Sequence, residues 1–416
     1  MINTLQLLYR LVFSVYLISL PLLVYGVSVS GFSVRFSRII LLLVIPLVAL
    51  KFWYRPALIL RDKFFLLALV PYLIYTSISI SWSPNVETGT GIQRLGGLYE
   101  VVLLYLACAA ADMRSRDFPF YAAVMTVSSI CPVFTALWQL ANNFLHFSPH
   151  ELPFPSLVIE GKYTEVVEGR YFVAASEFSR LSGTFAEPVI FASFLCTVLF
   201  LSLGLRPLGR CARMLLFAYR CLIVVIITFA LSKLALLCLF LGFAYLARHN
   251  VRILLSLLFL PVALLVIVWL MSMLGFGEIF DRLRSESGHY ELLVETLGLF
   301  DAFAIVVGNG IGSVPYGSFH RFVISRIYES GLVGLYFVVA LSIFALAAAF
   351  RRARDENDRR VRDACGAAVL SILFGLHVYD YFIHLSTWAV LGVVASNSGA
   401  VSGFRRSEVE KTMLVR

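Results

Sequence analysis

The sequence predicts an all-α protein that crosses a membrane many times, and composition and hydropathy carry most of this prediction. Of its 416 residues, 60% are hydrophobic and 14% are charged, and the mean hydropathy is +0.87. A soluble fold has too little polar surface to cover so many apolar side chains. Long apolar runs alternate with short clusters of Lys and Arg along the chain, which is typical of a polytopic helical bundle.

The individual spans follow from the length of each apolar run. A helix needs about 20 residues to cross about 30 Å of hydrocarbon. This criterion predicts about twelve helices in a single integral membrane domain, residues 1–416, whose first helix is not cleaved as a leader. The predicted spans are 11–28, 38–54, 63–82, 96–111, 118–145, 187–205, 214–230, 232–247, 251–273, 321–350, 364–383 and 385–402.

The distribution of positive charge predicts the orientation of these spans. The net charge is +9, but its Lys and Arg residues fall in turns on alternate sides of the predicted membrane. We therefore interpret the charge as a topology signal and not as a nucleic-acid surface. Both termini are then cytoplasmic, and two long polar loops, 146–186 and 274–320, lie together on the outer face. Charged membrane residues such as Glu100 should face the bundle interior.

Two shorter features shape the expected outer face. Residues 289–306 show the apolar and acidic alternation of an amphipathic helix. Residues 214–247 must cross twice around Leu231-Ser232-Lys233, which leaves about 16 residues for each pass and about 24 Å of helix. Lys233 is thus either drawn into a wet or anionic cavity or extended toward the outer headgroups, and the sequence leaves both alternatives open.

Several candidate site residues stand at junctions between polar loops and apolar helices. Arg180 opens the segment Arg-Leu-Ser-Gly-Thr-Phe-Ala-Glu-Pro, which runs to Pro188, and His320 follows the glycine-rich run Gly-Asn-Gly-Ile-Gly-Ser at 308–313. Simpler roles are open for the first junction, with Arg180 as an interfacial anchor, Glu187 as a helix cap and Pro188 as the first helical residue.

Other titratable residues have plainer explanations. Arg326 and Glu329 are three residues apart, which favours an ion pair within one helix. His377, Asp380 and His384 fit a hydrogen-bonded interfacial cluster better than a metal site. The seven cysteines suggest no disulfide or zinc framework, and we expect no metal or cofactor.

Five features of the chain, taken in order, resemble those of a known family. They are Arg180-Leu-Ser-Gly-Thr-Phe-Ala-Glu-Pro188, Leu-Ser-Lys233, Gly308-Asn-Gly-Ile-Gly-Ser313, His320 and Tyr-Glu-Ser-Gly-Leu-Val-Gly-Leu335. This family is the bacterial O-antigen ligase and O-antigen or exopolysaccharide polymerase superfamily. The resemblance covers residues 180–335, and Ser-Trp-Ser at 81–83 fits it too. It implies an inverting, metal-independent glycosyltransferase of the inner membrane, with its active site on the periplasmic or exterior face.

The resemblance also implies substrates and site residues. The donor is a glycan on undecaprenyl pyrophosphate, the acceptor is a sugar, and the partners include membrane lipids and a chain-length regulator. Arg180 matches an arginine that contacts pyrophosphate, and His320 matches a histidine that engages the acceptor or carrier. The chain departs from the pattern at three places: Arg284, Arg282 or His289 must replace an arginine usual near position 289, Lys233 replaces an arginine, and Arg321 stands where asparagine is common.

The chemistry of these residue types agrees with this implied activity. Guanidinium and ammonium groups, here Arg180, Lys233 and Arg284, stabilise the charge that develops on a departing pyrophosphate. The imidazole of His320 is a suitable base for an acceptor hydroxyl at neutral pH. We expect a polymerase of lipid-linked repeat units for O-antigen, capsule or exopolysaccharide. The alternatives are a ligase that passes glycan to lipid A core or protein and, from another class, a lipid-linked glycan or solute transporter without chemistry.

Overall fold

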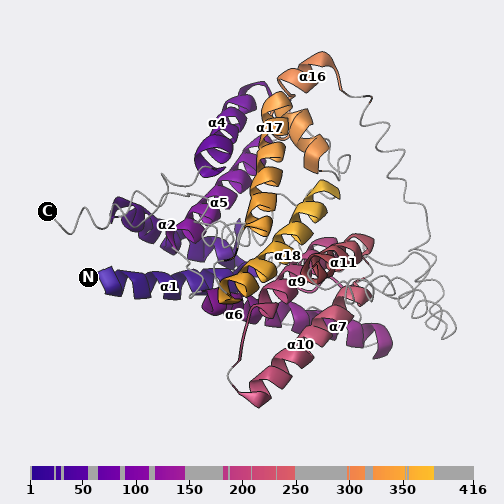
Figure 1. The fold of residues 1–416 in the computed structure, drawn as a ribbon. Helices are drawn as coiled ribbons and strands as arrows, with labels where there is room; N and C mark the ends of the chain where they lie inside the picture. The colour runs from indigo at the N-terminus through magenta and orange to yellow at the C-terminus, as the bar shows by residue number, and fades with distance from the viewer. Residues whose placement is uncertain are drawn as a thin grey trace.

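The computed structural model is a bundle of helices with one small β-hairpin (Figure 1). It describes residues 2–22, 25–29, 32–54, 64–84, 90–111, 118–145, 181–185, 188–207, 209–230, 232–248, 298, 300–313, 322–351, 353 and 356–378. The helices are α1 (Ile2–Ser19), α2 (Phe36–Tyr54), η1 (Phe65–Leu69), α4 (Val70–Ser79), η2 (Ile80–Trp82), α5 (Thr90–Ala110), α6 (Phe118–Ser128), α7 (Ile130–Leu145), α9 (Pro188–Leu203), α10 (Arg210–Phe229), α11 (Lys233–Ala247), α16 (Ala302–Val306), α17 (Phe322–Phe350) and α18 (Glu356–Val378). The strands are β1 (Gly26–Val29) and β2 (Phe32–Arg35).

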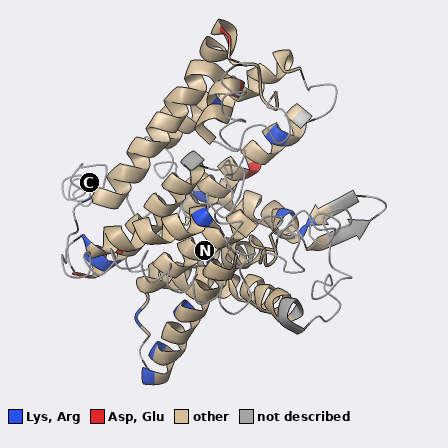
Figure 2. Cartoon of the chain, turned by 90° about the vertical axis from the view of Figure 1, so that its right-hand side faces the viewer, with Lys and Arg blue, Asp and Glu red and all other residues tan. Residues whose placement is uncertain are grey.

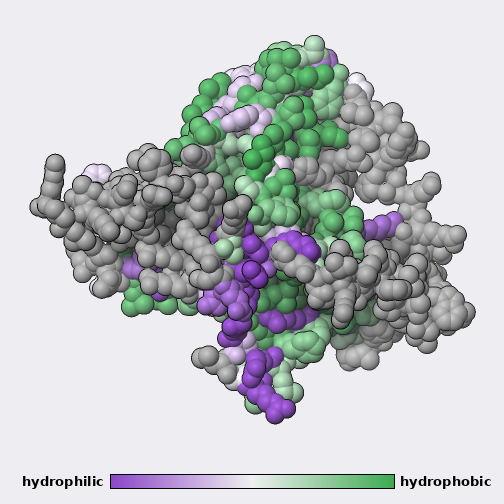
Figure 3. Space-filling view, viewed as in Figure 1, coloured by the Kyte–Doolittle hydropathy of each residue, from purple (hydrophilic) through white to green (hydrophobic). Residues whose placement is uncertain are grey.

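Within the described residues, five helices are long and apolar enough to cross a membrane. They cover Phe36–Tyr54, Phe65–Trp82, Phe118–Ala141, Arg210–Phe229 and Phe322–Phe350. Most of the described chain carries no charge (Figure 2), and hydrophobic residues dominate the upper part of the face in Figure 3. These observations agree with the predicted helical membrane protein, while the predicted spans 251–273 and 385–402 lie outside the described residues.

The first predicted span, 11–28, is wrong at both ends. The helix α1 runs from Ile2 to Ser19, and residues 26–29 instead pair antiparallel with residues 32–35, with Gly26 opposite Arg35. Valine and serine alternate through this stretch, and a period of two favours a strand over a helix. Hydropathy alone did not distinguish the two.

One predicted span keeps its bounds but contains a break, and one predicted helix is interrupted near its end. The segment 118–145 forms two helices that part at Ser129, where the hydroxyls of Ser128 and Ser129 bond back to the carbonyls of Met125 and Thr126. The helix expected over 289–306 does not run unbroken to its end. Asp301 is extended, and its carboxylate accepts a hydrogen bond from the amide of Ala304 at 2.6 Å, so that α16 starts only at Ala302.

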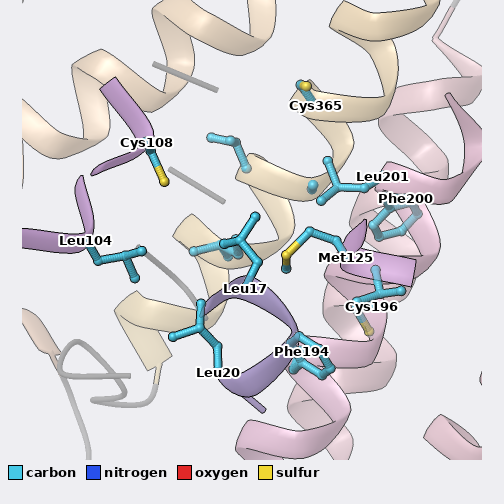
Figure 4. Close-up of a cluster of buried hydrophobic side chains, with 14 of the residues drawn as sticks. Leu17, Leu20, Leu104, Cys108, Met125, Phe194, Cys196, Phe200, Leu201 and Cys365 are labelled. Carbon is cyan, nitrogen blue, oxygen red and sulfur yellow. The ribbon is translucent and has the colours of Figure 1, made fainter. Parts of the chain in front are cut away.

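The core surrounds α9, whose residues are all buried except Val189 and Leu203. This helix packs against α6, α10, α11 and α18. Figure 4 shows the region where side chains of α1, α5, α6 and α9, among them Leu17, Leu104, Met125 and Phe194, gather in one buried cluster. Such a helix is apolar on every side because it is in contact with protein all round.

Interhelical contacts fix the relative directions of α9 and α11. The thiol of Cys196 donates to the carbonyl of Ala235 at 3.5 Å, and farther along both helices the rings of Phe200 and Phe243 meet with centroids 5.4 Å apart. Residue numbers rise together, so α9 and α11 are parallel.

Further contacts relate α18 and α17 to α11. Cys238 of α11 exchanges hydrogen bonds with Ser371 of α18, and Arg248 pairs with Asp363 at 2.6 Å, so α11 and α18 are antiparallel. The hydroxyl of Tyr245, near the end of α11, donates to Ala349 near the end of α17. The ends of α9, α11 and α17 therefore meet at one end of the bundle, called here the far end. The region away from it, which holds the starts of α9 and α11 and the Gly331 break of α17, is called here the loop end.

Candidate functional site

The glycine loop, residues 308–313, lies buried at the loop end between α4, η2 and α17. Its three glycines have φ values of 85°, 88° and 80°, which only glycine adopts without strain. The indole of Trp82 donates to the carbonyl of Gly308 at 3.1 Å, and the amide of Ile311 donates to the hydroxyl of Ser79 at 3.2 Å. The end of the third predicted span thus holds one side of this loop.

A break in α17 holds the other side of the glycine loop. Gly331 has φ 55° and ψ −137°, so the helical hydrogen-bond pattern stops there. The carbonyls of Tyr328 and Glu329, just before the break, instead accept the amides of Asn309 at 2.8 Å and Gly310 at 3.0 Å. The break therefore provides backbone acceptors for loop amides that would otherwise be buried without partners.

The Glu329 cluster is a buried ionic group formed by Arg94, Arg326, Glu329 and the amide of Gly312. The Glu329 side chain is fully buried, and its Oε1 lies 2.6 Å from Arg94 Nη1 and accepts the Gly312 amide at 3.0 Å. Its Oε2 lies 2.9 Å from Arg326 Nη1, which also donates to the Tyr72 hydroxyl at 3.3 Å. Two guanidinium groups face one carboxylate, so the cluster carries one net positive charge.

This cluster confirms one sequence prediction and extends it. The pair Arg326–Glu329 forms within one helix, as its spacing indicated. The contribution of Arg94 was missed, because residue 94 lies before the predicted span 96–111 and 235 positions from its partner. A charged residue beside a membrane segment is a signal for such a site, but only the fold identifies the partner.

The second buried turn at the loop end, residues 181–185, is held by a neutral side chain. Gln139 of α7 accepts the amides of Ser182 and Gly183 through Oε1, both at 3.0 Å, and its Nε2 donates to the Ser182 hydroxyl at 3.2 Å. Gly183 has φ 56°, and a Cβ there would lie 2.7 Å from the ring of Phe191. We call this segment the Gln139 turn; the role of Gln139 was not predicted from the sequence.

The hairpin between α10 and α11 places Lys233 at the loop end. The hydroxyl of Ser232 caps α11 by accepting the amide of Ala235 at 3.2 Å, and Lys233, the first helical residue, is exposed. Its second helix has 15 residues, as short as expected, but α10 has 20 and begins four residues earlier than predicted. Only one pass of this hairpin is therefore short.

The other predicted site residues lie outside the described residues. They are Arg180, Glu187, Arg282, Arg284, His289, His320 and Arg321. The described residues nearest to Arg180 and His320 in sequence are Leu181 and Phe322, and both are buried. Lys233 is thus the one predicted site residue among those the structure describes.

Glu100, which had no partner visible in the sequence, pairs with Arg38 at 2.5 Å between α5 and α2. Among the described residues, no three His, Cys, Asp or Glu side chains gather closely enough to hold a metal ion. The amides of the two buried turns are used within the protein, and Lys233 at the start of α11 is the exposed cationic side chain that suits an anionic group.

Comparison with known proteins leaves these structural observations as the basis for assigning a function. The chain matches no known protein-family profile and no curated protein sequence.

Proposed function

We propose that this protein is a glycosyltransferase of the bacterial inner membrane that polymerises oligosaccharide repeat units carried on undecaprenyl pyrophosphate. One observation supports the proposal: Lys233 is exposed at the start of α11, and Arg180 and His320 stand in sequence shortly before the starts of two other apolar helices, α9 and α17. Residues 180–335, which resemble the ligase and polymerase superfamily, form the core of this assignment. The loop end then faces the periplasm or the exterior.

The donor is held by its charge. A pyrophosphate ester carries negative charge that grows as its bond to the sugar breaks, and cationic groups at a partly dry site stabilise that growth. We assign this role to Arg180, Lys233 and Arg284, with Arg282, His289 and Arg321 as further substrate-binding residues. Lys233 is exposed at the first position of α11, where the positive end of the helix dipole adds to its attraction for an anion. Glu187 is the remaining substrate-binding residue that we assign, for sugar hydroxyls.

The acceptor reacts by a single displacement that inverts the anomeric carbon. An acceptor hydroxyl oxygen attacks that carbon, the bond to the pyrophosphate oxygen breaks, and the released lipid pyrophosphate keeps the electron pair. The hydroxyl proton passes to the imidazole of His320, which acts as the general base. This sequence of bond changes balances without a metal ion, because the cationic residues supply the positive charge.

Deletion of the gene in its host tests the proposal directly. The envelope polysaccharide is separated on a gel, and the strain is complemented with the parent gene or with His320→Ala. A polymerase predicts loss of long chains, with single repeats left on the carrier or on lipid A, and rescue by the parent alone. Long polymer that accumulates on the carrier beside bare lipid A would establish the ligase instead. An unchanged profile contradicts both glycan functions and favours transport of intact substrate.

Purified protein separates chemistry from transport. In detergent with lipid-linked repeat units extracted from the host, Arg180→Gln and Lys233→Gln should each lower the rate of extension by about 10²-fold or more, as loss of one charge-stabilising group does elsewhere. The matched control is Arg206→Gln, which removes an exposed charge at the far end and should leave the rate unchanged.

A further inference from the structure

Arg94 is the member of the Glu329 cluster that comes from outside residues 180–335. It lies near the start of α5, and its guanidinium Nη1 is 2.6 Å from Glu329 Oε1. That same oxygen accepts the amide of Gly312 at 3.0 Å. A single carboxylate oxygen thus joins a side chain of α5 to the backbone of the glycine loop.

The packing of α5 against the loop supports this connection. A Cβ added to Gly91 would lie 3.1 Å from the carbonyl oxygen of Ile311, so α5 approaches the loop backbone closely one turn before Arg94. Arg94 remains 23% exposed, whereas Glu329 is fully buried. The arginine therefore spans the distance from the rim of the bundle to the buried carboxylate.

The charge of Arg94 decides how firmly the carboxylate is held. Arg326 approaches Oε2 from the same helix as Glu329, so it cannot connect α17 to another element through this contact. The ionic connection of the Glu329 carboxylate, and of the loop amide bound to it, to α5 is made by Arg94. A hydrogen bond between two ionised groups is about twice as strong as one between neutral groups.

We propose that Arg94 and Glu329 are positioning residues that hold the glycine loop in the conformation from which the chain continues to His320. The inference rests on the proposed function for the role of His320, but its structural part can be tested without that function. Neither residue touches the reacting atoms in the proposed reaction; both act through the loop.

Hydrogen exchange of the loop amides tests the structural part. In full-length protein in lipid nanodiscs, Arg94→Gln should speed exchange of the Asn309, Gly310 and Gly312 amides by about tenfold, because local opening becomes easier. The peptide that covers the Gln139 turn should not change. The matched control is Arg38→Gln, which breaks the other ion pair of α5, 2.5 Å long, with no contact to the loop. Unchanged loop exchange in Arg94→Gln would overturn the inference.

A conservative variant guards against loss of folding. Arg94→Lys keeps the positive charge but loses the planar fork of the guanidinium. We expect it to raise loop exchange by about threefold, less than Arg94→Gln, since only part of the contact is lost. Exchange equal to that of the parent in both variants that fold would again overturn the inference.

Extension kinetics test the functional part. A positioning role predicts that Arg94→Gln lowers kcat by about tenfold while the KM for the lipid-linked donor stays within about twofold, because misplacing a base affects the chemical step. Arg94→Lys should recover part of kcat. If the parent extends no glycan, the proposed function fails and the exchange experiment alone decides the structural part. If Arg94→Gln shows fast loop exchange but parental kcat, the positioning role fails and the proposed function stands.

Discussion

The two buried turns at the loop end are held by different kinds of side chain. The neutral amide of Gln139 forms hydrogen bonds with the backbone amides of Ser182 and Gly183 and with the Ser182 hydroxyl. Glu329 satisfies the glycine loop with a carboxylate that needs two arginines beside it. A neutral group can lose its partner at the cost of one hydrogen bond, whereas a buried charge that loses its partner costs several times more. The comparison therefore predicts unequal sensitivity to mutation.

Glu329→Gln should have the largest effect. The amide side chain can still accept the Gly312 amide, but it removes the negative charge that the Arg94 and Arg326 guanidiniums face. Removing one partner of a buried ion pair destabilises by about 3–5 kcal/mol. The free energy of unfolding in an SDS titration from mixed micelles measures the loss. Glu100→Gln is the matched control, and we expect a smaller loss there because its partner Arg38 is 46% exposed.

Gly331→Ala should come next. The positive φ of Gly331 costs a side chain about 1–3 kcal/mol, and the new Cβ would lie 2.4 Å from the carbonyl oxygen of Val306. We expect a loss of about 3 kcal/mol in the same titration, together with faster exchange of the Asn309 and Gly310 amides.

The same substitution at Gly96 gives the control for Gly331. Gly96 lies in α5 with no atom near its Cβ position, and Ala there should stabilise the helix by about 0.5–1 kcal/mol. Opposite signs at the two glycines would show that the break in α17 requires glycine. Equal effects would contradict that conclusion.

Gln139→Met tests the neutral side of the comparison. Methionine has a similar length but cannot accept the amides of Ser182 and Gly183, and each buried donor left without a partner costs about 1–3 kcal/mol. For two donors at the lower end of that range we expect a total loss of about 2 kcal/mol, below that of Glu329→Gln, because no charge is left behind. Gln93→Met, at an exposed position of α5, should change the unfolding free energy by less than about 0.5 kcal/mol. A loss at Gln139 equal to that at Glu329 would contradict the proposed difference between the turns.

The sequence predicted much of the helical frame but little of what holds the two turns. The segments 38–54, 232–247 and 321–350 match α2, α11 and α17 closely, because a long apolar run determines a membrane helix locally. The strand pair at 26–35 was missed because its apolar content resembles that of a helix. Its alternation of valine and serine was the signal that hydropathy ignored.

Contacts between distant segments could not be predicted from the sequence, for a different reason. The spacing of Arg326 and Glu329 is set by the helical repeat, so their pairing could be predicted. The contacts of Arg94 with Glu329 and of Gln139 with Ser182 join residues 235 and 43 positions apart. No periodicity encodes such contacts, because they depend on which helices pack together. The break at Gly331 likewise becomes intelligible only beside the amides of Asn309 and Gly310.

The smallest expected effect belongs to the far end of the bundle. Arg206 and Glu356 form an ion pair of 3.4 Å whose side chains are 66% and 81% exposed, and such pairs contribute about 0–1 kcal/mol. Arg206→Gln should therefore leave unfolding within about 0.5 kcal/mol of the parent. At the same end, Asp358 accepts two bonds from Arg351, at 2.5 and 2.9 Å, and is only 6% exposed.

The exposed and the buried ion pair at the far end together test whether burial or location determines how much an ion pair stabilises the protein. If burial decides the strength of an ion pair, Asp358→Asn should destabilise the protein clearly more than Arg206→Gln, although both substitutions lie at the far end. If location decides it, the two variants should behave alike and both should differ from Glu329→Gln at the loop end. The buried Asp358 carboxylate joins the end of α17 to the start of α18. Measured side by side, these variants show whether the sensitivity of the glycine loop comes from its buried charge or from its place in the bundle.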